Sequence, residues 1–231
     1  MNLRQKPLNF SPISHLLHLF VFIFVFFLSC TVSAKIINSN NQIQSQSRSL
    51  SPFQQVVVDG DFHVIINHSD QQRISISTSS NIQPYIQTQV RNQRLYIHYR
   101  KYTAIQNEQT PNISINLPTL SGAQLNGNAT LDATGINGTQ FTGIVNGKGQ
   151  MALSGFIDRA TLRTHGNGQI DAKNLRANNA VITIDGNGNI AATAKDSMKV
   201  KINGSGSVTY YGNPAFFQPQ INGNGSVKRG N

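Results

Sequence analysis

The sequence predicts an all-β protein, a right-handed parallel β-helix (solenoid) with an irregular β N-terminal cap. A seven-residue pattern recurs six times in the second half of the chain. The first of its seven positions is apolar in most repeats. The next six hold Asn, Asp or His, then Gly, any residue, Gly or Ala, a polar residue and an apolar residue. Its first Gly stands at 127, 147, 166, 186, 204 and 223, so the steps are 20, 19, 20, 18 and 19 residues. A fixed period of this size is typical of solenoids, in which each repeat is one coil stacked on the last.

Apolar residues flank the glycine turn of each repeat, as Leu125 and Leu131 do, and no helical i, i+3, i+4 pattern is present there. We expect these side chains to point inward and to stack into columns, with neighbouring coils paired as parallel strands about 4.8 Å apart. Positive φ is free for Gly and tolerable for Asn, which we take as the reason why Asn126 and Asn146 precede the first Gly. The right hand follows from the general preference of parallel crossovers.

The N-terminus has the three parts of a secretory signal peptide over residues 1–34. Arg4 and Lys6 precede an apolar run over residues 16–28, and Val32-Ser33-Ala34 is a small-residue cleavage site. As a helix, the run would span about 20 Å, which is short of a bilayer core of about 30 Å. A leader therefore explains this segment better than a membrane anchor does, and we expect an exported protein in the periplasm, at the outer membrane or outside the cell.

Cys30 is the one cysteine of the chain, so cleavage after Ala34 would leave a mature protein without disulfides. In an alternative processing, Phe27-Leu28-Ser29-Cys30 resembles a loose lipobox, and lipidation at Cys30 would tie the protein to a membrane. The formal net charge is +10, and loss of Arg4 and Lys6 with the leader lowers it to +8. The cations are scattered singly, which is typical of a solvated surface rather than of a nucleic-acid-binding patch.

Four segments follow one another along the chain. Residues 35–52 are rich in Asn, Gln and Ser and read as a flexible linker. Residues 53–119 carry short alternating strands that we expect to form the cap. Residues 120–231 hold the repeats of about 19 residues, and residues 53–231 are expected to form one continuous domain.

Within the cap, Asp59-Gly60-Asp61 between two apolar runs predicts a hairpin. Further strands are expected at residues 74–77, 90–99 (with a turn at Asn92-Gln93) and 113–117. A short helical turn is expected within residues 81–87, and a polar loop over residues 102–110.

The Gly-x-Gly turns, the leading strands and Ser205-Gly206-Ser207-Val208-Thr209-Tyr210-Tyr211-Gly212-Asn213-Pro214 together resemble the bacterial GIN domain, described as the head of "putative autotransporter adhesins". The resemblance extends from Val56 to Val227. It implies a β-helical domain of the cell envelope or surface, with no catalytic motif to carry over.

The residues themselves predict no enzyme, no metal and no cofactor. Asp132 and Asp171 are expected in one column two coils apart, about 9.6 Å at strand spacing, which is the outer limit for an inverting glycosidase pair. Asp185 is the one acid at the turns, which argues against calcium ligation, and the histidines lack metal-ligand spacing. No nucleophile elbow, Walker loop or Cys-His pair is present.

We therefore expect an adhesion or binding module of the envelope that takes a glycan or another envelope component. The alternatives are a polysaccharide-acting β-helix enzyme and a purely structural periplasmic protein. One possible ligand face is the column of variable polar residues at the turns, and solvated turns are the plain alternative for it. The column consists of Asn128, Lys148, Asn167, Asn187, Ser205 and Asn224.

Overall fold

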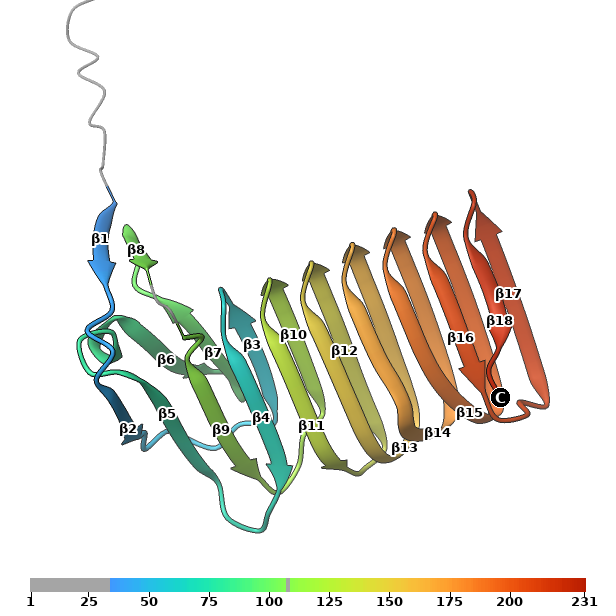
Figure 1. Ribbon diagram of the computed structural model, residues 1–231. Helices are drawn as coiled ribbons and strands as arrows, with labels where there is room; N and C mark the ends of the chain where they lie inside the picture. The colour runs from blue at the N-terminus through green and yellow to red at the C-terminus, as the bar shows by residue number, and fades with distance from the viewer. Residues whose placement is uncertain (1–33, 107–108) are drawn as a thin grey trace, which may run out of the picture. The chain divides into compact units, whose positions relative to one another are not determined.

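Each coil of the solenoid consists of two strands that face each other (Figure 1), and apolar side chains fill the space between them. The computed structural model describes residues 34–106 and 109–231, so the expected leader and Cys30 lie outside the described residues, apart from Ala34. Residues 35–231 form one unit. No helix in the described part of the chain is long and apolar enough to cross a membrane.

One sheet of the solenoid is made by the strands that run into the Asn-Gly corner, and we call it the leading face. It contains β3 (Gln55–Asp59), β10 (Gly122–Gly127), β12 (Gln140–Gly147), the second halves of β13 (Gln150–Gly166), β14 (Gln169–Gly186) and β15 (Asn189–Gly204), and β17 (Phe216–Asn222). These strands pair in parallel, each with the next.

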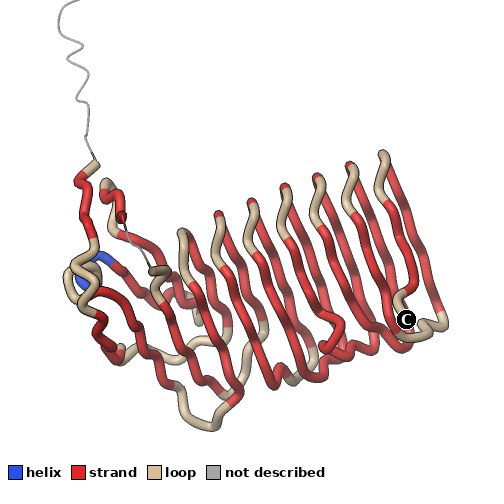
Figure 2. The backbone as a smooth tube through the Cα atoms, viewed as in Figure 1, coloured by secondary structure: helices blue, strands red, loops and turns tan. Residues whose placement is uncertain are grey.

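The opposite sheet, the trailing face, is made by the strands that leave that corner. It contains β4 (His63–His68), β11 (Thr130–Ile136), the first halves of β13, β14 and β15, β16 (Ser207–Tyr211) and β18 (Ser226–Arg229), again in parallel. The short loops of the Asn-Gly corner align along one edge of the stack (Figure 2). The predicted class, an all-β parallel solenoid, is confirmed.

The predicted hairpin around Gly60 is wrong, because β3 and β4 do not pair with each other. β3 pairs in parallel with β10, and β4 with β11. Asp59 lies in register with Asn126, and Gly60 has a φ of +120°. Asp-Gly suits a hairpin turn and a solenoid corner equally well, since both need positive φ. The stacked coils therefore begin at Gln55, inside the segment of residues 53–119 that was expected to supply the N-terminal strands of the cap.

The remaining strands form the cap. They are β1 (Lys35–Asn38), β2 (Ile43–Ser47), β5 (Arg73–Ser79), β6 (Ile86–Arg91), β7 (Arg94–Tyr99), β8 (Thr103–Gln106) and β9 (Asn112–Leu117), with a 3₁₀ turn over Gln83–Tyr85. The expected turn at Asn92-Gln93 joins the antiparallel β6 and β7, and both of its residues have positive φ. The strands expected at residues 74–77 and 113–117 and the turn within 81–87 are confirmed.

The prediction of a flexible linker over residues 35–52 is wrong, because this segment contributes two strands. β1 pairs in parallel with β8, which itself lies in the expected loop 102–110, and β2 pairs antiparallel with β5. The side chain of Asn81 also donates to the backbone oxygen of Asn38 (2.7 Å). Polar composition hid these strands, because backbone pairing requires no apolar side chain.

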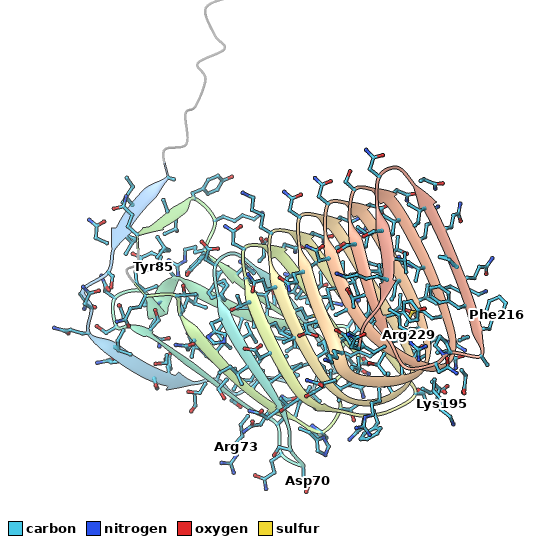
Figure 3. The ribbon with its side chains drawn as sticks, turned by 45° about the vertical axis from the view of Figure 1, so that its right-hand side comes forward. Asp70, Arg73, Tyr85, Lys195, Phe216 and Arg229 are labelled. Atoms are coloured by element: carbon cyan, nitrogen blue, oxygen red, sulfur yellow. The ribbon has the colours of Figure 1, made fainter. Side chains whose placement is uncertain are left out.

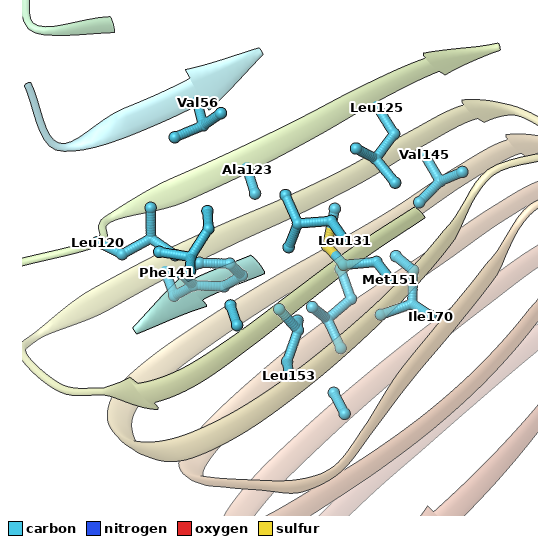
Figure 4. Close-up of a cluster of buried hydrophobic side chains, with 14 of the residues drawn as sticks. Val56, Leu120, Ala123, Leu125, Leu131, Phe141, Val145, Met151, Leu153 and Ile170 are labelled. Atoms are coloured by element: carbon cyan, nitrogen blue, oxygen red, sulfur yellow. The ribbon is translucent and has the colours of Figure 1, made fainter. Parts of the chain in front are cut away.

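The core consists of apolar columns that run along the stack (Figure 4). One column contains Val145, Thr164, Ile184 and Ile202 in register. In the five later repeats, the second Gly lies beside this column. A Cβ at Gly168 would clash with Cγ1 of Val145, so that position has no room for a side chain.

Thr164 is the polar member of this column, and its hydroxyl is fully buried without a hydrogen-bond partner among the described residues. We expect Thr164→Val to raise the free energy of unfolding by about 1 kcal/mol, because an unsatisfied buried hydroxyl is removed. A methyl group fits in the place of the hydroxyl. The Thr164 hydroxyl lies against Gly188, and the Cγ2 methyl groups of Ile184 and Ile202 lie in the same way against the second Gly of later coils. Urea unfolding measures the change, and a loss of stability would contradict it.

Candidate functional site

The Asn-Gly corner carries two neighbouring columns of polar side chains. The inner ladder consists of the residues that precede the first Gly: Asp59, Asn126, Asn146, His165, Asp185, Asn203 and Asn222. Its members bind one another between coils. Asn146 Nδ2 donates to Asn126 Oδ1 (2.8 Å), Asn203 Nδ2 to Asp185 Oδ1 (2.6 Å) and Asn222 Nδ2 to Asn203 Oδ1 (3.0 Å).

These contacts correct the reason given above for the asparagines. The positive φ of the corner belongs to the glycines, whereas the positive-φ residues other than Gly in the described chain are Asn41, Asn92, Gln93 and Tyr102. The inner ladder is polar because its amides bridge successive coils. His165 joins the same network, with Nδ1 3.2 Å from Asp185 Oδ2. The inner ladder is thus a structural feature, half-buried at most of its positions.

The six residues of the predicted ligand face lie one step after the first Gly, and we call them the outer ladder. All six are exposed: Asn128, Lys148, Asn167, Asn187, Ser205 and Asn224. Backbone hydrogen bonds stack them, since Lys148 N donates to Gly127 O (3.0 Å) and Asn167 N to Gly147 O (2.9 Å). Asn187 Nδ2 also donates to Asn167 Oδ1 (3.4 Å). The structure therefore brings these residues together in one column, at steps of about 4.8 Å.

The outer ladder begins beside a depression of about 390 Å³ where the solenoid meets the cap. Asn128 lines it together with Asp59, Asp61 and Tyr99. Burial, and then the negative charge of Asp61, raise the pKa of Tyr99. Its hydroxyl, which stays protonated, donates to the backbone oxygen of Asp61 (3.3 Å). The depression thus combines hydrogen-bonding groups from both parts of the fold.

The two aspartates weighed above as an acid pair do share one column of the trailing face, with Ala152 in register between them. Both carboxylates have partners. His63 Nε2 lies 3.1 Å from Asp132 Oδ2, and Asp171 Oδ1 accepts from the backbone N–H of Lys173 (3.1 Å). Among residues 34–106 and 109–231, no three His, Cys, Asp or Glu side chains gather as metal ligands.

A second group of exposed and half-buried side chains lies at the corner opposite the ladders, and the sequence did not point to it. We call Phe156, Lys173, Arg176 and Tyr211 the aromatic–cation cluster. The guanidinium carbon of Arg176 lies 5.4 Å from the centre of the Phe156 ring, and Lys173 Nζ lies 4.5 Å from that of Tyr211. All four line a depression of about 400 Å³.

Known proteins identify the family of this fold. A family profile described as "Putative auto-transporter adhesin, head GIN domain" matches residues 52–214. The chain belongs to the GIN-domain family. No curated protein matches the sequence.

Solved structures share the fold of this GIN-domain protein at low sequence identity. A crystal structure described as a putative adhesin from Bacteroides fragilis NCTC 9343 has 22% identity and a TM-score of 0.69, covering 84% of this chain and 99% of that one. A second, described as a putative lipid binding protein from Parabacteroides distasonis ATCC 8503, has 20% identity and a TM-score of 0.55, with 85% and 100% covered. At these identities the likeness concerns the fold.

Proposed function

We propose that this GIN-domain protein is exported and acts as a non-enzymatic adhesion or binding module of the cell envelope or surface. The outer ladder is the observation that carries the proposal. Its six exposed polar side chains form a column with a fixed step, on a corner that the inner ladder holds rigid. A repeating column of amide, hydroxyl and ammonium groups suits an extended ligand that itself repeats, such as a glycan chain.

The stacked backbone favours this use of the corner, because it sets the spacing of the six side chains before a ligand binds. Membership in a family described as adhesin heads supports the same class of function. The column of Asp132 and Asp171 gives weaker support to the alternative, an enzyme, because His63 and the backbone of Lys173 already engage the two carboxylates.

Binding of the mature protein to a glycan array and to whole cells tests the proposal. We expect Lys148→Ala/Asn167→Ala/Asn187→Ala to reduce binding by about tenfold or more, since three neighbouring contacts are lost, while the melting temperature changes little. Asn203→Ala in the inner ladder is the matched control. It breaks two inter-coil hydrogen bonds, so it should lower the melting temperature while leaving the outer ladder in place.

Unaltered binding by the triple variant would remove the outer ladder as the ligand face, and a wild-type protein that binds no glycan and no cells would contradict the proposal itself. Export is tested separately, by cell fractionation and mass spectrometry of the mature N-terminus. A terminus at Lys35 indicates simple cleavage, and a lipid-modified Cys30 indicates membrane attachment. An uncleaved protein in the cytoplasm would contradict export.

A further inference from the structure

The aromatic–cation cluster is built on one register column of the trailing face. Phe156 pairs with Arg176, Arg176 with Thr193, and Thr193 with Tyr211, so the column crosses four successive coils. At about 4.8 Å per coil, the two aromatic residues stand roughly 14 Å apart along the stack. A cation and a hydroxyl lie between them, and Thr193 lines the same depression as the four cluster residues.

A bulge in β14 presents the second cation of the cluster. Ala172 pairs with Ala192 and Arg176 with Thr193, so residues 173–175 have no register partner on β15. Bulges of this kind redirect side chains and are common beside functional sites. Thr193 Oγ1 donates to the backbone oxygen of Lys173 (2.6 Å), which fixes the bulged segment. The ammonium group of Lys173 lies over the Tyr211 ring, 4.5 Å from its centre.

Among the residues that the structure describes, neither cation has a carboxylate within ion-pair distance. The ion pairs within the described residues are His63–Asp132 and His165–Asp185, on other parts of the coils. Asp171, the acid nearest to Lys173 in sequence, accepts from the backbone N–H of that residue (3.1 Å) and forms no ion pair with its ammonium group, and Asp158 accepts from Asn178 Nδ2 (3.0 Å). A further cation, Lys195 (labelled in Figure 3), is exposed and follows Thr193 by two residues in the chain. The cluster is therefore a concave surface with positive charge available for a ligand.

Aromatic rings and unpaired cations in one depression suit a particular ligand chemistry. The face of an aromatic ring carries partial negative charge and packs on the C–H groups of a sugar ring. Guanidinium and ammonium groups bind carboxylate or sulfate through charge-assisted hydrogen bonds. We infer that the aromatic–cation cluster is a binding subsite for an anionic polysaccharide, whose sugar rings stack on Phe156 and Tyr211 while its acidic groups meet Lys173 and Arg176. This inference rests on the proposed function and names its ligand class.

The test measures binding of the mature protein to dextran sulfate, polygalacturonate and unsulfated dextran by biolayer interferometry at physiological salt. We expect the two anionic polymers to bind and dextran to bind at least about tenfold more weakly. Lys173→Ala/Arg176→Ala should weaken anionic binding by about tenfold or more. Phe156→Ala should weaken it by about fivefold without any change in net charge, and Phe156→Tyr should restore it.

The matched control is Lys199→Ala/Lys201→Ala, which removes the same charge from exposed positions on the leading face. We expect less than about a twofold loss from it. An equal loss from this control, or no loss from Phe156→Ala, would show that binding is general charge attraction and would overturn the inference. Absence of binding to both anionic polymers would also overturn it, whereas ladder-dependent binding of neutral glycans would leave the proposed function standing. Melting temperatures of all variants exclude misfolding as the cause.

Discussion

Gly186→Ala should lower the free energy of unfolding by about 3 kcal/mol or more. Gly186 forms the corner of its coil with a φ of +124°, a conformation that strains any residue with a Cβ. The added Cβ would also lie 2.6 Å from the backbone oxygen of Gly166 in the preceding coil. That oxygen accepts the N–H of Asn187 (2.8 Å), so relief of the clash must break a hydrogen bond that stacks the outer ladder.

Gly127→Ala is the matched control for this corner. Gly127 also has positive φ (+94°), but a Cβ there would meet nothing within 4 Å. The control should cost about 1–2 kcal/mol, from backbone strain alone. Urea unfolding followed by far-UV circular dichroism measures both variants. Equal losses of stability would mean that backbone strain alone, and not the close stacking of the corners, accounts for the effect of Gly186→Ala.

The repeat predicted the stacking of the coils because a local pattern directly sets the register between neighbours. Leu125 and Val145 occupy the same position of the pattern, and they are indeed paired. The coil at Gly60 escaped this reasoning. Its corner is 67 residues before Gly127 (127 − 60), because the cap strands β5 to β9 lie between the two coils and interrupt the period. A period search cannot find a repeat that is separated from the others by an insertion.

The candidate sites differ in the same way. The outer ladder could be predicted, because its exposure and alignment follow from the period itself. The aromatic–cation cluster could not, because Phe156 and Arg176 stand 20 residues apart (176 − 156) in a part of the coil where the sequence does not repeat. The register column that joins them shifts near Lys173, both where β14 pairs with β13 and where it pairs with β15. These shifts are a property of backbone geometry. An exposed Phe next to a bulge has no signature in the sequence.

Phe141→Ala should lower the free energy of unfolding by about 3–5 kcal/mol. The Phe141 ring is fully buried and lies in the core cluster with Leu120 and Leu153 (Figure 4). Its register column continues as Ala160, Ala180 and Met198, so the next two coils offer only methyl groups. Small neighbours cannot move into the space that the ring leaves, and the cavity term of the substitution should therefore be large.

Phe156→Ala is the control of the same chemistry, because Phe156 is 64% exposed and its loss opens no cavity. We expect a change within about 0.5 kcal/mol, measured with Phe141→Ala in one series of urea titrations. The two phenylalanines would then differ in role. Loss of Phe141 would destabilise the stack, whereas loss of Phe156 would leave the fold intact and weaken the binding of the anionic ligand. A large loss of stability from Phe156→Ala would instead show that the ring stabilises the fold. Its cation–π contact with Arg176 would then no longer support a binding role.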